Sequence, residues 1–212
     1  MTVKEEYNQT LADTVIKNLK KRQMNAVYCA TAKEAADYAL SLVSAGSSVS
    51  FGGSMTLAES GILDRLRSRN DIKLLDRSTT QNPDEIKQIY HDALSADYYF
   101  MSTNALTING ELVNIDGNGN RVAALIYGPE HVIIVSSLNK VVPDVETAVS
   151  RVRNQATPPN CIRLNKSTPC AATGICADCF AEDCICNQIV ITRRSGNPER
   201  IQVVLVGETL GY

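Results

Sequence analysis

The sequence contains no tryptophan, and aromatic residues make up only 5% of its 212 positions. Proteins that bind single-stranded nucleic acids stack the bases on aromatic side chains, so this scarcity argues against such a surface. An excess of positive charge is also missing, because 21 basic residues stand against 23 acidic ones. A balanced charge gives no strong attraction to DNA or to an anionic membrane. We therefore expect no nucleic-acid partner.

Long apolar runs are absent as well. No stretch approaches the roughly 20 apolar residues that a membrane-spanning helix needs, and residues 1–10 lack the apolar segment of a secretory signal. We expect a cytoplasmic protein without a membrane span. The length suits one domain over residues 1–212, with residues 156–188 as a cysteine-rich insertion.

The first half of the chain alternates between two hydrophobic patterns. Apolar residues recur every four positions from Val3 to Leu19 and predict a helix over residues 3–24. Short apolar runs then predict strands at 26–30, 48–51, 72–75 and 98–101, with helices between them at 31–43, 56–69 and 82–94. This alternation predicts the α/β class, with a mostly parallel sheet flanked by helices.

The second half of the chain has a different pattern. Asn109-Gly110 predicts a β-hairpin between residues 105–108 and 111–115. Further strands are expected at 122–127, 132–136, 189–192 and 201–206, and a helix at 144–153. The polar segment 156–188 contains three prolines and is expected to be a loop or a small cysteine knuckle.

A glycine pair joins a predicted strand to a predicted helix in the sequence SFGGSMTLAE, where Thr56 and Glu59 have the spacing of a capping box. Glycines allow close approach of a ligand to the backbone, and the free amides of a helix start favour an anion. The candidate ligand-binding residues are Gly52, Gly53, Ser54, Met55 and Thr56. An ordinary capped turn is the alternative. The segment is neither a Walker A loop nor a dinucleotide fingerprint, so no flavin or NAD motif is present.

A polar segment follows the strand predicted at 98–101. Ligands of open α/β sheets bind at the carboxyl ends of the strands, which makes Ser102, Thr103, Asn104, Asn120 and Arg121 candidates for ligand binding. Glu111, Asp116 and Lys140 are the candidate catalytic acid/base residues. The alternative is that the Asn, Asp and Gly residues only form turns, and that the lysine is solvated.

Six of the seven cysteines fall between Cys161 and Cys186. Their spacing, Cys170-x5-Cys176-x2-Cys179-x4-Cys184-x-Cys186, predicts a metal site, because zinc and iron–sulfur clusters each take four protein ligands. Two alternatives stay open, a reversible Cys176–Cys179 disulfide and free buried thiols. Cys29 lies in a predicted strand and is expected in the core.

Four stretches together resemble the LUD (lactate utilisation) family, which includes the C subunit of bacterial lactate-utilisation operons. They are GGSMTLAESG, STNALTINGELVNIDGNGNRVAALIYGP, the cysteine run ending in CICN, and the closing VGETLGY. The resemblance covers residues 7–212, and the cysteine run marks a branch of the family rather than its core pattern.

The resemblance implies a fold similar to that of glucosamine-6-phosphate deaminase, ribose-5-phosphate isomerase and CoA transferases. In those relatives an anionic group binds at the turn that residues 52–56 occupy here. Residues 116–121 and Lys140 stand broadly where the isomerases carry an acidic loop and a lysine, although the acidic isomerase motif is not reproduced.

The family implies a component of a system that oxidises L-lactate to pyruvate, with a small anionic ligand and partner subunits that carry iron–sulfur motifs. A homo-oligomer is compatible with this role. Two alternatives are a stand-alone enzyme for a small phosphorylated or acyl substrate, and a metal- or redox-sensing module.

Overall fold

A computed structural model describes all residues, 1–212, and contains a six-stranded sheet at its centre. The strands lie in the order β1-β10-β7-β4-β2-β3, and every neighbouring pair is parallel. Their bounds are β1 Asn25–Cys29, β2 Ser48–Phe51, β3 Lys73–Leu75, β4 Tyr98–Met101, β7 His131–Ser137 and β10 Ile201–Val206. The α/β class with a mostly parallel sheet is therefore confirmed.

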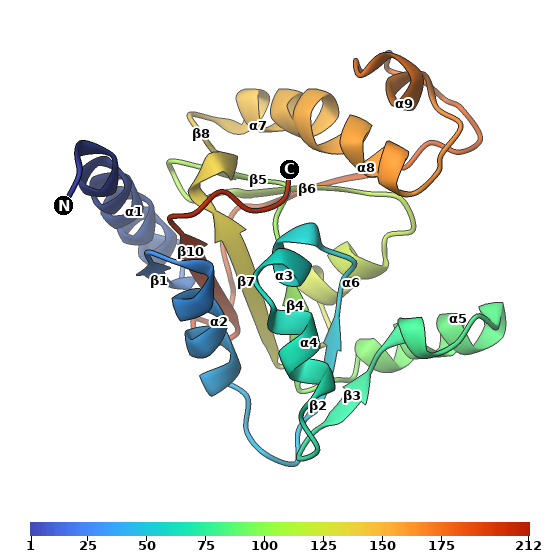
Figure 1. The fold of residues 1–212 in the computed structure, drawn as a ribbon, viewed down its shortest axis with the longest axis horizontal. Coiled ribbons are helices and arrows are strands. Elements are labelled where there is room, and N and C mark those ends of the chain that lie inside the picture. Colours follow the sequence, from blue (N-terminus) through green and yellow to red (C-terminus); the bar gives the residue numbers. More distant parts are fainter.

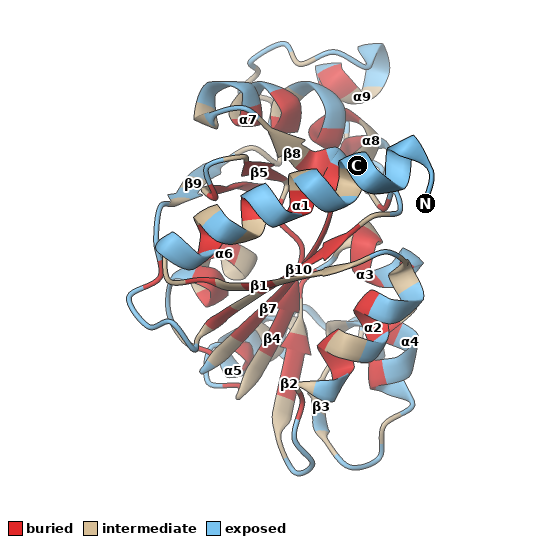
Figure 2. Ribbon diagram, turned by 90° about the vertical axis from the view of Figure 1, so that its left-hand side faces the viewer, coloured by how far each residue is buried: buried red, intermediate tan, exposed pale blue.

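Helices cover both faces of this sheet (Figures 1 and 2). One layer contains α1 (Val3–Lys21), α5 (Pro83–Ala93) and α6 (Asn120–Ile126), and the other contains α2 (Ala32–Ser41), α3 (Met55–Glu59) and α4 (Ile62–Arg67). Side chains of a strand point alternately to its two faces. Val203 and Leu205 of β10 accordingly pack with α1, whereas Val204 and Val206 pack with α2. This two-sided burial explains why the central strands are almost entirely apolar.

A smaller mixed sheet lies above the first in the view of Figure 1, in the order β8-β5-β6-β9. Its strands are β5 Ala105–Thr107, β6 Leu112–Asp116, β8 Val141–Val142 and β9 Gln188–Thr192. The antiparallel pairing of β5 with β6 confirms the hairpin. A long helical segment covers this sheet, formed by α7 (Val145–Arg151), a π-helical turn (Val152–Ala156) and α8 (Thr157–Arg163).

The predicted strand at residues 122–127 is wrong, because this segment forms helix α6. Gly119 adopts a left-handed conformation with φ of +83° at the N-cap, and a carboxylate oxygen of Asp116 accepts the amide of Val122. The helix buries Val122, Ala124 and Leu125 and leaves Ile126 exposed. An apolar run of this length fits either a strand or a buried helix turn, and the glycine-rich start decides for the helix.

Two other helix predictions need correction. The single helix expected over 56–69 is divided into α3 and α4 at Gly61, which has a left-handed φ of +74°. Ser54, not Thr56, caps α3, because its hydroxyl accepts the amide of Leu57. The Thr31–Glu34 capping box, by contrast, is present at the start of α2.

The cysteine-rich segment is more ordered than expected. Its first part continues as α8, since proline is tolerated in the first turn of a helix, and Pro169–Thr173 forms α9. Residues 174–187 then contain no helix or strand. The last two strands do not pair with each other: β9 joins the small sheet, and β10 lies in the centre of the large one. None of the helices combines the length and the apolar composition that a membrane crossing requires.

Candidate functional site

A cavity of about 320 Å³ lies beside the carboxyl ends of β2, β4 and β6. This is the edge at which open α/β sheets bind ligands. Eleven of the residues predicted from the sequence line it: Gly53, Ser54, Met55, Thr56, Ser102, Thr103, Asn104, Asp116, Asn120, Arg121 and Lys140. The structure thus brings together segments that are up to 87 positions apart in the sequence, from Gly53 to Lys140.

Two predicted residues do not line the cavity. Gly52 lies behind it, where the absence of a side chain leaves room for Arg121, whose Cδ is 3.2 Å from the position that a Cβ would take. Glu111 is at the far end of the β5–β6 hairpin, where it pairs with Arg22 and accepts the hydroxyl of Thr107. Glu111 therefore connects the hairpin to the end of α1 and does not face the cavity.

Lys140 is the most unusual lining residue. It follows β7 in a short 3₁₀ turn and is only 4% exposed. Its Nζ donates hydrogen bonds to Thr56 Oγ1 at 2.8 Å and to Ser102 Oγ at 3.2 Å. No carboxylate lies within ion-pair distance of it. A buried ammonium with only hydroxyl partners is costly, since a charge in a poorly solvated site normally requires a counter-ion.

The electrostatic surroundings of Lys140 favour its neutral form. Burial is the main cause, the positive charges of Arg151 and Arg121 act in the same direction, and the more distant carboxylate of Glu59 opposes them. Together they lower the pKa of Lys140 from 10.5 to about 7. A lysine with a pKa near 7 can act as a base or a nucleophile, and it can also bind an anion by taking up a proton.

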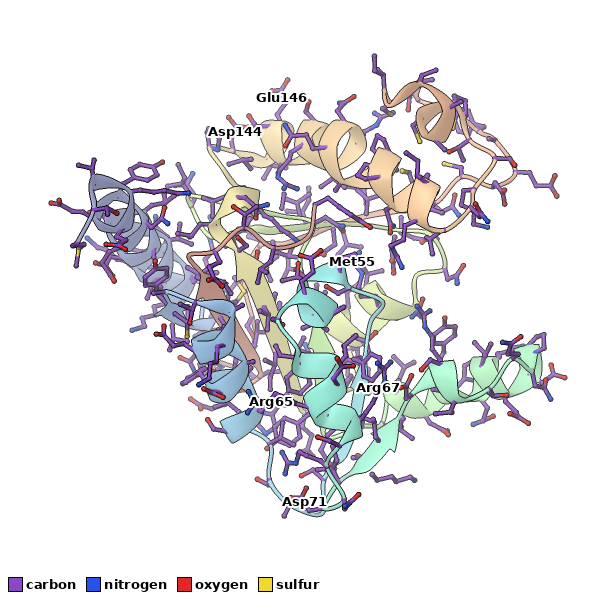
Figure 3. The ribbon with its side chains drawn as sticks, viewed as in Figure 1. Met55, Arg65, Arg67, Asp71, Asp144 and Glu146 are labelled. Atoms are coloured by element: carbon purple, nitrogen blue, oxygen red, sulfur yellow. The ribbon has the colours of Figure 1, made fainter.

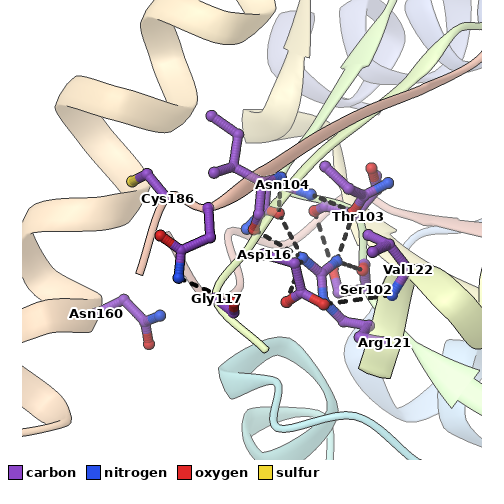
Figure 4. A network of polar contacts seen from close by, with 12 residues as sticks. Ser102, Thr103, Asn104, Asp116, Gly117, Arg121, Val122, Asn160 and Cys186 are labelled. Carbon is purple, nitrogen blue, oxygen red and sulfur yellow. Dashed lines mark hydrogen bonds and ion pairs between the residues drawn. The ribbon is translucent and has the colours of Figure 1, made fainter. Parts of the chain in front are cut away.

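Arg121 is held by a network of hydrogen bonds (Figure 4). Its Nη1 donates to Asn114 Oδ1 at 2.5 Å and to the carbonyl of Ser102 at 3.2 Å, and its Nη2 donates to Asn104 Oδ1 at 2.9 Å and to the carbonyl of Ile115 at 3.0 Å. These partners occupy most of the donors of the guanidinium. Arg121 therefore holds the segments after β4 and β6 together, and it contributes charge to the cavity rather than free donors.

Three further cations line the cavity and were not predicted, Arg77, Arg163 and Lys166. Arg77 lies over the ring of Tyr90 at 5.5 Å and also bonds to its hydroxyl. Arg77 follows β3 and lies at the same sheet edge as the predicted residues. Its position directly after a predicted strand could therefore have identified it as a cavity residue. With Arg121, these residues make four cations against one lining carboxylate, Asp116, and Lys140 adds a fifth when it is protonated. The cavity is therefore suited to an anion.

The helix start contributes less to this preference than the sequence suggested. Met55 lies at the upper end of α3, towards the small sheet, while Arg65 and Arg67 of α4 lie farther down (Figure 3). Helix α3 has only five residues, and the Ser54 hydroxyl accepts one of its first free amides. Its dipole is correspondingly small. The arginines and Lys166 around the cavity carry the charge of the site, and Lys140 adds to it when it is protonated.

The last residues of the chain form another wall. Gly211 donates its amide to a carboxylate oxygen of Glu59 at 2.7 Å, and Tyr212 lines the cavity. Gly211 has a left-handed φ of +58°, and a Cβ there would lie 2.6 Å from Thr56 Oγ1 and 3.2 Å from Lys140 Nζ. Only glycine fits this position against the lysine.

A second cavity, of about 310 Å³, lies beside this site. It is lined by all six cysteines of the C-terminal cluster: Cys161, Cys170, Cys176, Cys179, Cys184 and Cys186. All seven cysteines are free, and no three Cys, His, Asp or Glu side chains are close enough together to hold a metal ion. Burial raises the pKa of Cys161 and of Cys186 to about 11, so both are protonated at neutral pH. Cys29 lies in β1 and packs against the core, as expected.

Comparison with known proteins gives a match to one family model, the LUD domain, over residues 12–206. The structure is similar to a DUF162 family protein from Deinococcus radiodurans, with a TM-score of 0.53 and 13% identity over 94% of this chain and 98% of that one.

Ribose 5-phosphate isomerase A from Neisseria gonorrhoeae aligns with a TM-score of 0.35 and 15% identity, over 57% of this chain and 62% of that one. Ribose 5-phosphate isomerase from Plasmodium falciparum aligns with a TM-score of 0.33 and 14% identity, over 51% of each chain. Scores this low do not support the transfer of an activity. No curated protein matches the sequence significantly. The family model covers most of the chain, and the protein therefore belongs to the LUD domain family.

Proposed function

We propose that this protein takes part in lactate utilisation and binds a small carboxylate in the cavity around Lys140, within a system that oxidises L-lactate to pyruvate. Family membership is associated with lactate utilisation. The observation that carries the proposal is the buried amino group of Lys140, which has two hydroxyl partners and no carboxylate to pair with when it is protonated. A bound carboxylate would supply that counter-ion.

The remaining lining supports the same ligand class. Arg77 has no carboxylate partner, and Lys166 is only partly neutralised by Asp183 at 3.0 Å. Ser102 and Thr56 offer hydroxyls beside the ammonium, which suits a 2-hydroxy or 2-oxo acid with a second polar oxygen. Since the sequence has no flavin or nicotinamide motif, we assign electron transfer to partner subunits with iron–sulfur clusters.

Calorimetric titration of the purified chain with L-lactate, pyruvate and inorganic phosphate tests this function. Lys140→Met should weaken carboxylate binding at least tenfold, because it removes the charge that would be paired. Binding should also weaken as the pH rises above about 7, since the bound anion requires the protonated amine. The matched control is Lys73→Met, which removes an exposed lysine of β3 far from the cavity. Equal affinities of Lys140→Met and the wild type would exclude this assignment.

A second function is favoured by the lowered pKa of Lys140. A neutral amine at pH 7 can accept a proton from a carbon next to a carbonyl group, which is the first step of many isomerisations of small phosphorylated or acyl compounds. Asp116, also in the cavity, is the candidate second proton-transfer group.

Proton exchange tests this alternative directly. Small sugar phosphates and acyl thioesters would be incubated with the protein in D₂O, and loss of the C–H signal followed by NMR. We expect exchange with the wild type and a loss of at least about 10²-fold for Lys140→Met. No exchange across the panel would leave the carboxylate-binding function standing and remove the enzymatic one.

A further inference from the structure

The cysteine-lined cavity has the composition of a metal site. Its six thiols come from α8, α9 and the segment 174–187, and they face a common space whose other walls are mainly apolar. Arg153 is its only cationic lining residue and Asp178 its only acidic one, and these two form an ion pair with each other. Six thiols that share one space without forming a single disulfide form a ligand-rich site that neither proposed function uses.

Two of the thiols already stand at a metal-binding distance. Cys161 Sγ and Cys170 Sγ are 3.7 Å apart, and both residues are buried in helices, at 1% and 6% exposure. Two thiolates on one tetrahedral zinc ion, with Zn–S bonds of about 2.3 Å, are separated by about 3.8 Å. A disulfide requires about 2.05 Å. The spacing therefore matches two ligands of one ion and not a covalent bond.

A second pair of thiols lies on the segment after α9, in the wall of the same cavity. Cys176 and Cys179 have the two-residue spacing that lets both thiolates reach one ion. Asp178 has a left-handed φ of +48° and donates its amide to Cys176 Sγ at 3.5 Å. Amide donors of this kind stabilise a thiolate and orient it towards a metal.

We propose that Cys161, Cys170, Cys176 and Cys179 bind one Zn²⁺ ion as four thiolates. Cys161 and Cys170 form the fixed half of the site, and the Cys176–Cys179 turn closes onto them when the metal arrives. The two halves are separate in this structure, in which no three of the thiols are close enough together to hold an ion. Residues 174–187 contain no helix or strand, and the contacts that hold this segment, Asp178 with Arg153 and Asp183 with Lys166 and Ser167, would have to adjust during the movement.

Formation of the site releases protons to the solvent and leaves a negatively charged centre. Four thiols release four protons on binding Zn²⁺, and the resulting centre carries a net charge of −2. The guanidinium of Arg153 is the one cationic group in the cavity wall, and it is paired with Asp178. Cys186 is assigned to packing, because its sulfur is 3.7 Å from Thr157 Oγ1 and contacts the core beneath α7 and α8. Cys184 Sγ accepts the amide of Cys186 at 3.4 Å, and the proposed set takes Cys176 and Cys179 instead because only these two have the two-residue spacing of a chelating pair.

Titration of the full-length, reduced chain with Co²⁺, followed by displacement with Zn²⁺, tests the site. We expect one ion per chain, thiolate-to-cobalt charge-transfer absorption of a four-sulfur site, and release of protons on binding. Cys161→Ser should weaken binding at least tenfold, and so should Cys170→Ser and the double variant Cys176→Ser/Cys179→Ser. Cys29→Ser, which removes the cysteine outside the cavity, is the control and should bind as the wild type does.

Three results would overturn the proposal: no binding by the wild type, unchanged binding by Cys161→Ser and Cys170→Ser, or isolation of the protein with iron and acid-labile sulfide. If one variant does not fold, the metal stoichiometry and the cobalt spectrum of the wild type and of the other variants still show whether the four-thiolate site exists. Carboxylate binding at Lys140 is measured separately, so failure of one proposal does not affect the other.

Discussion

Lys140 Nζ lies 2.8 Å from the hydroxyl of Thr56, and this contact joins the turn after β7 to the first turn of α3 at the edge of the sheet. Neither Thr56 nor Ser102, the two hydrogen-bond partners of the Lys140 amine, offers a negative charge. The site thus holds a lysine whose charge is not compensated by the protein itself, a situation that is common where a ligand completes the charge balance.

The first prediction concerns the cost of burying Lys140. Its pKa is about 7 in the folded chain and 10.5 in the unfolded one, so between these values the unfolded state binds more protons and the free energy of unfolding rises with pH. Lys140→Met should therefore stabilise the protein by about 1–3 kcal/mol near pH 7, less than the full linkage value of about 5 kcal/mol, because two hydroxyls lose their donor.

Urea denaturation at pH 6.5, 7.5, 9 and 10 would measure this difference, with the pH range set by the folded and unfolded pKa values. The advantage of Lys140→Met should shrink towards pH 10. A constant difference across the series would mean that Lys140 keeps a normal pKa.

The second prediction concerns the Arg121 network. Lysine in this position keeps the charge but cannot reach Asn114, Asn104 and the two carbonyls with one ammonium. Arg121→Lys should lower the free energy of unfolding by about 2–4 kcal/mol, because buried acceptors lose their donors. Arg163→Ala is the control: this exposed residue bonds only to Asn160, and its loss should change stability by less than about 0.5 kcal/mol. Similar effects of the two variants would contradict the structural role of Arg121.

The third prediction separates backbone strain from steric collision at Gly211. Gly211→Ala and Gly46→Ala both place alanine at a positive φ, +58° and +82°, and each should cost about 1–2 kcal/mol of stability. Only the first adds a Cβ against Thr56 Oγ1 and Lys140 Nζ, whereas the space around Gly46 is open. Calorimetry should therefore find weaker carboxylate binding for Gly211→Ala alone. If both variants bind equally well, the chain end does not shape the cavity.

Much of the framework was predictable because its determinants are local. Each central strand is a short apolar run, and the helix starts at Thr31 and Asn82 carry their own capping signals. Helix α6 was not predicted, because a run of five apolar residues fits a strand as well as a buried helix turn. The left-handed φ of Gly119, which starts the helix, is visible only in the structure.

The site was predictable in composition but not in geometry. The glycine turn, the polar segment after β4 and Lys140 were all selected as sheet-edge residues, and the cavity contains them. The sequence could not reveal that Arg22 holds Glu111 away from the site, or that Cys161 lies 3.7 Å from Cys170. Those relationships depend on how distant segments pack, which local patterns do not encode.

The last prediction connects the two cavities through the segment that separates them. Ile115, Thr157 and Ile185 line both. Asn187 donates its backbone amide to the carbonyl of Asp116 at 3.0 Å and its side-chain amide to the carbonyl of Gly117 at 3.1 Å. Zinc bound by Cys176 and Cys179 should restrain the segment 174–187, of which Asn187 is the last residue, and so stabilise this clamp on the wall that carries Asp116.

Hydrogen exchange with and without zinc would measure the effect. The Asn187 amide should exchange at least tenfold more slowly in the zinc-bound protein, because opening the clamp then requires the metal-bound segment to move as well. The amide of Gly46, which donates to the carbonyl of Asp71 far from the cysteines, is the internal control and should be unaffected. Equal exchange of Asn187 in both states would mean that the cysteine site does not influence the cavity around Lys140. Slower exchange would make metal occupancy a determinant of the shape of the anion site.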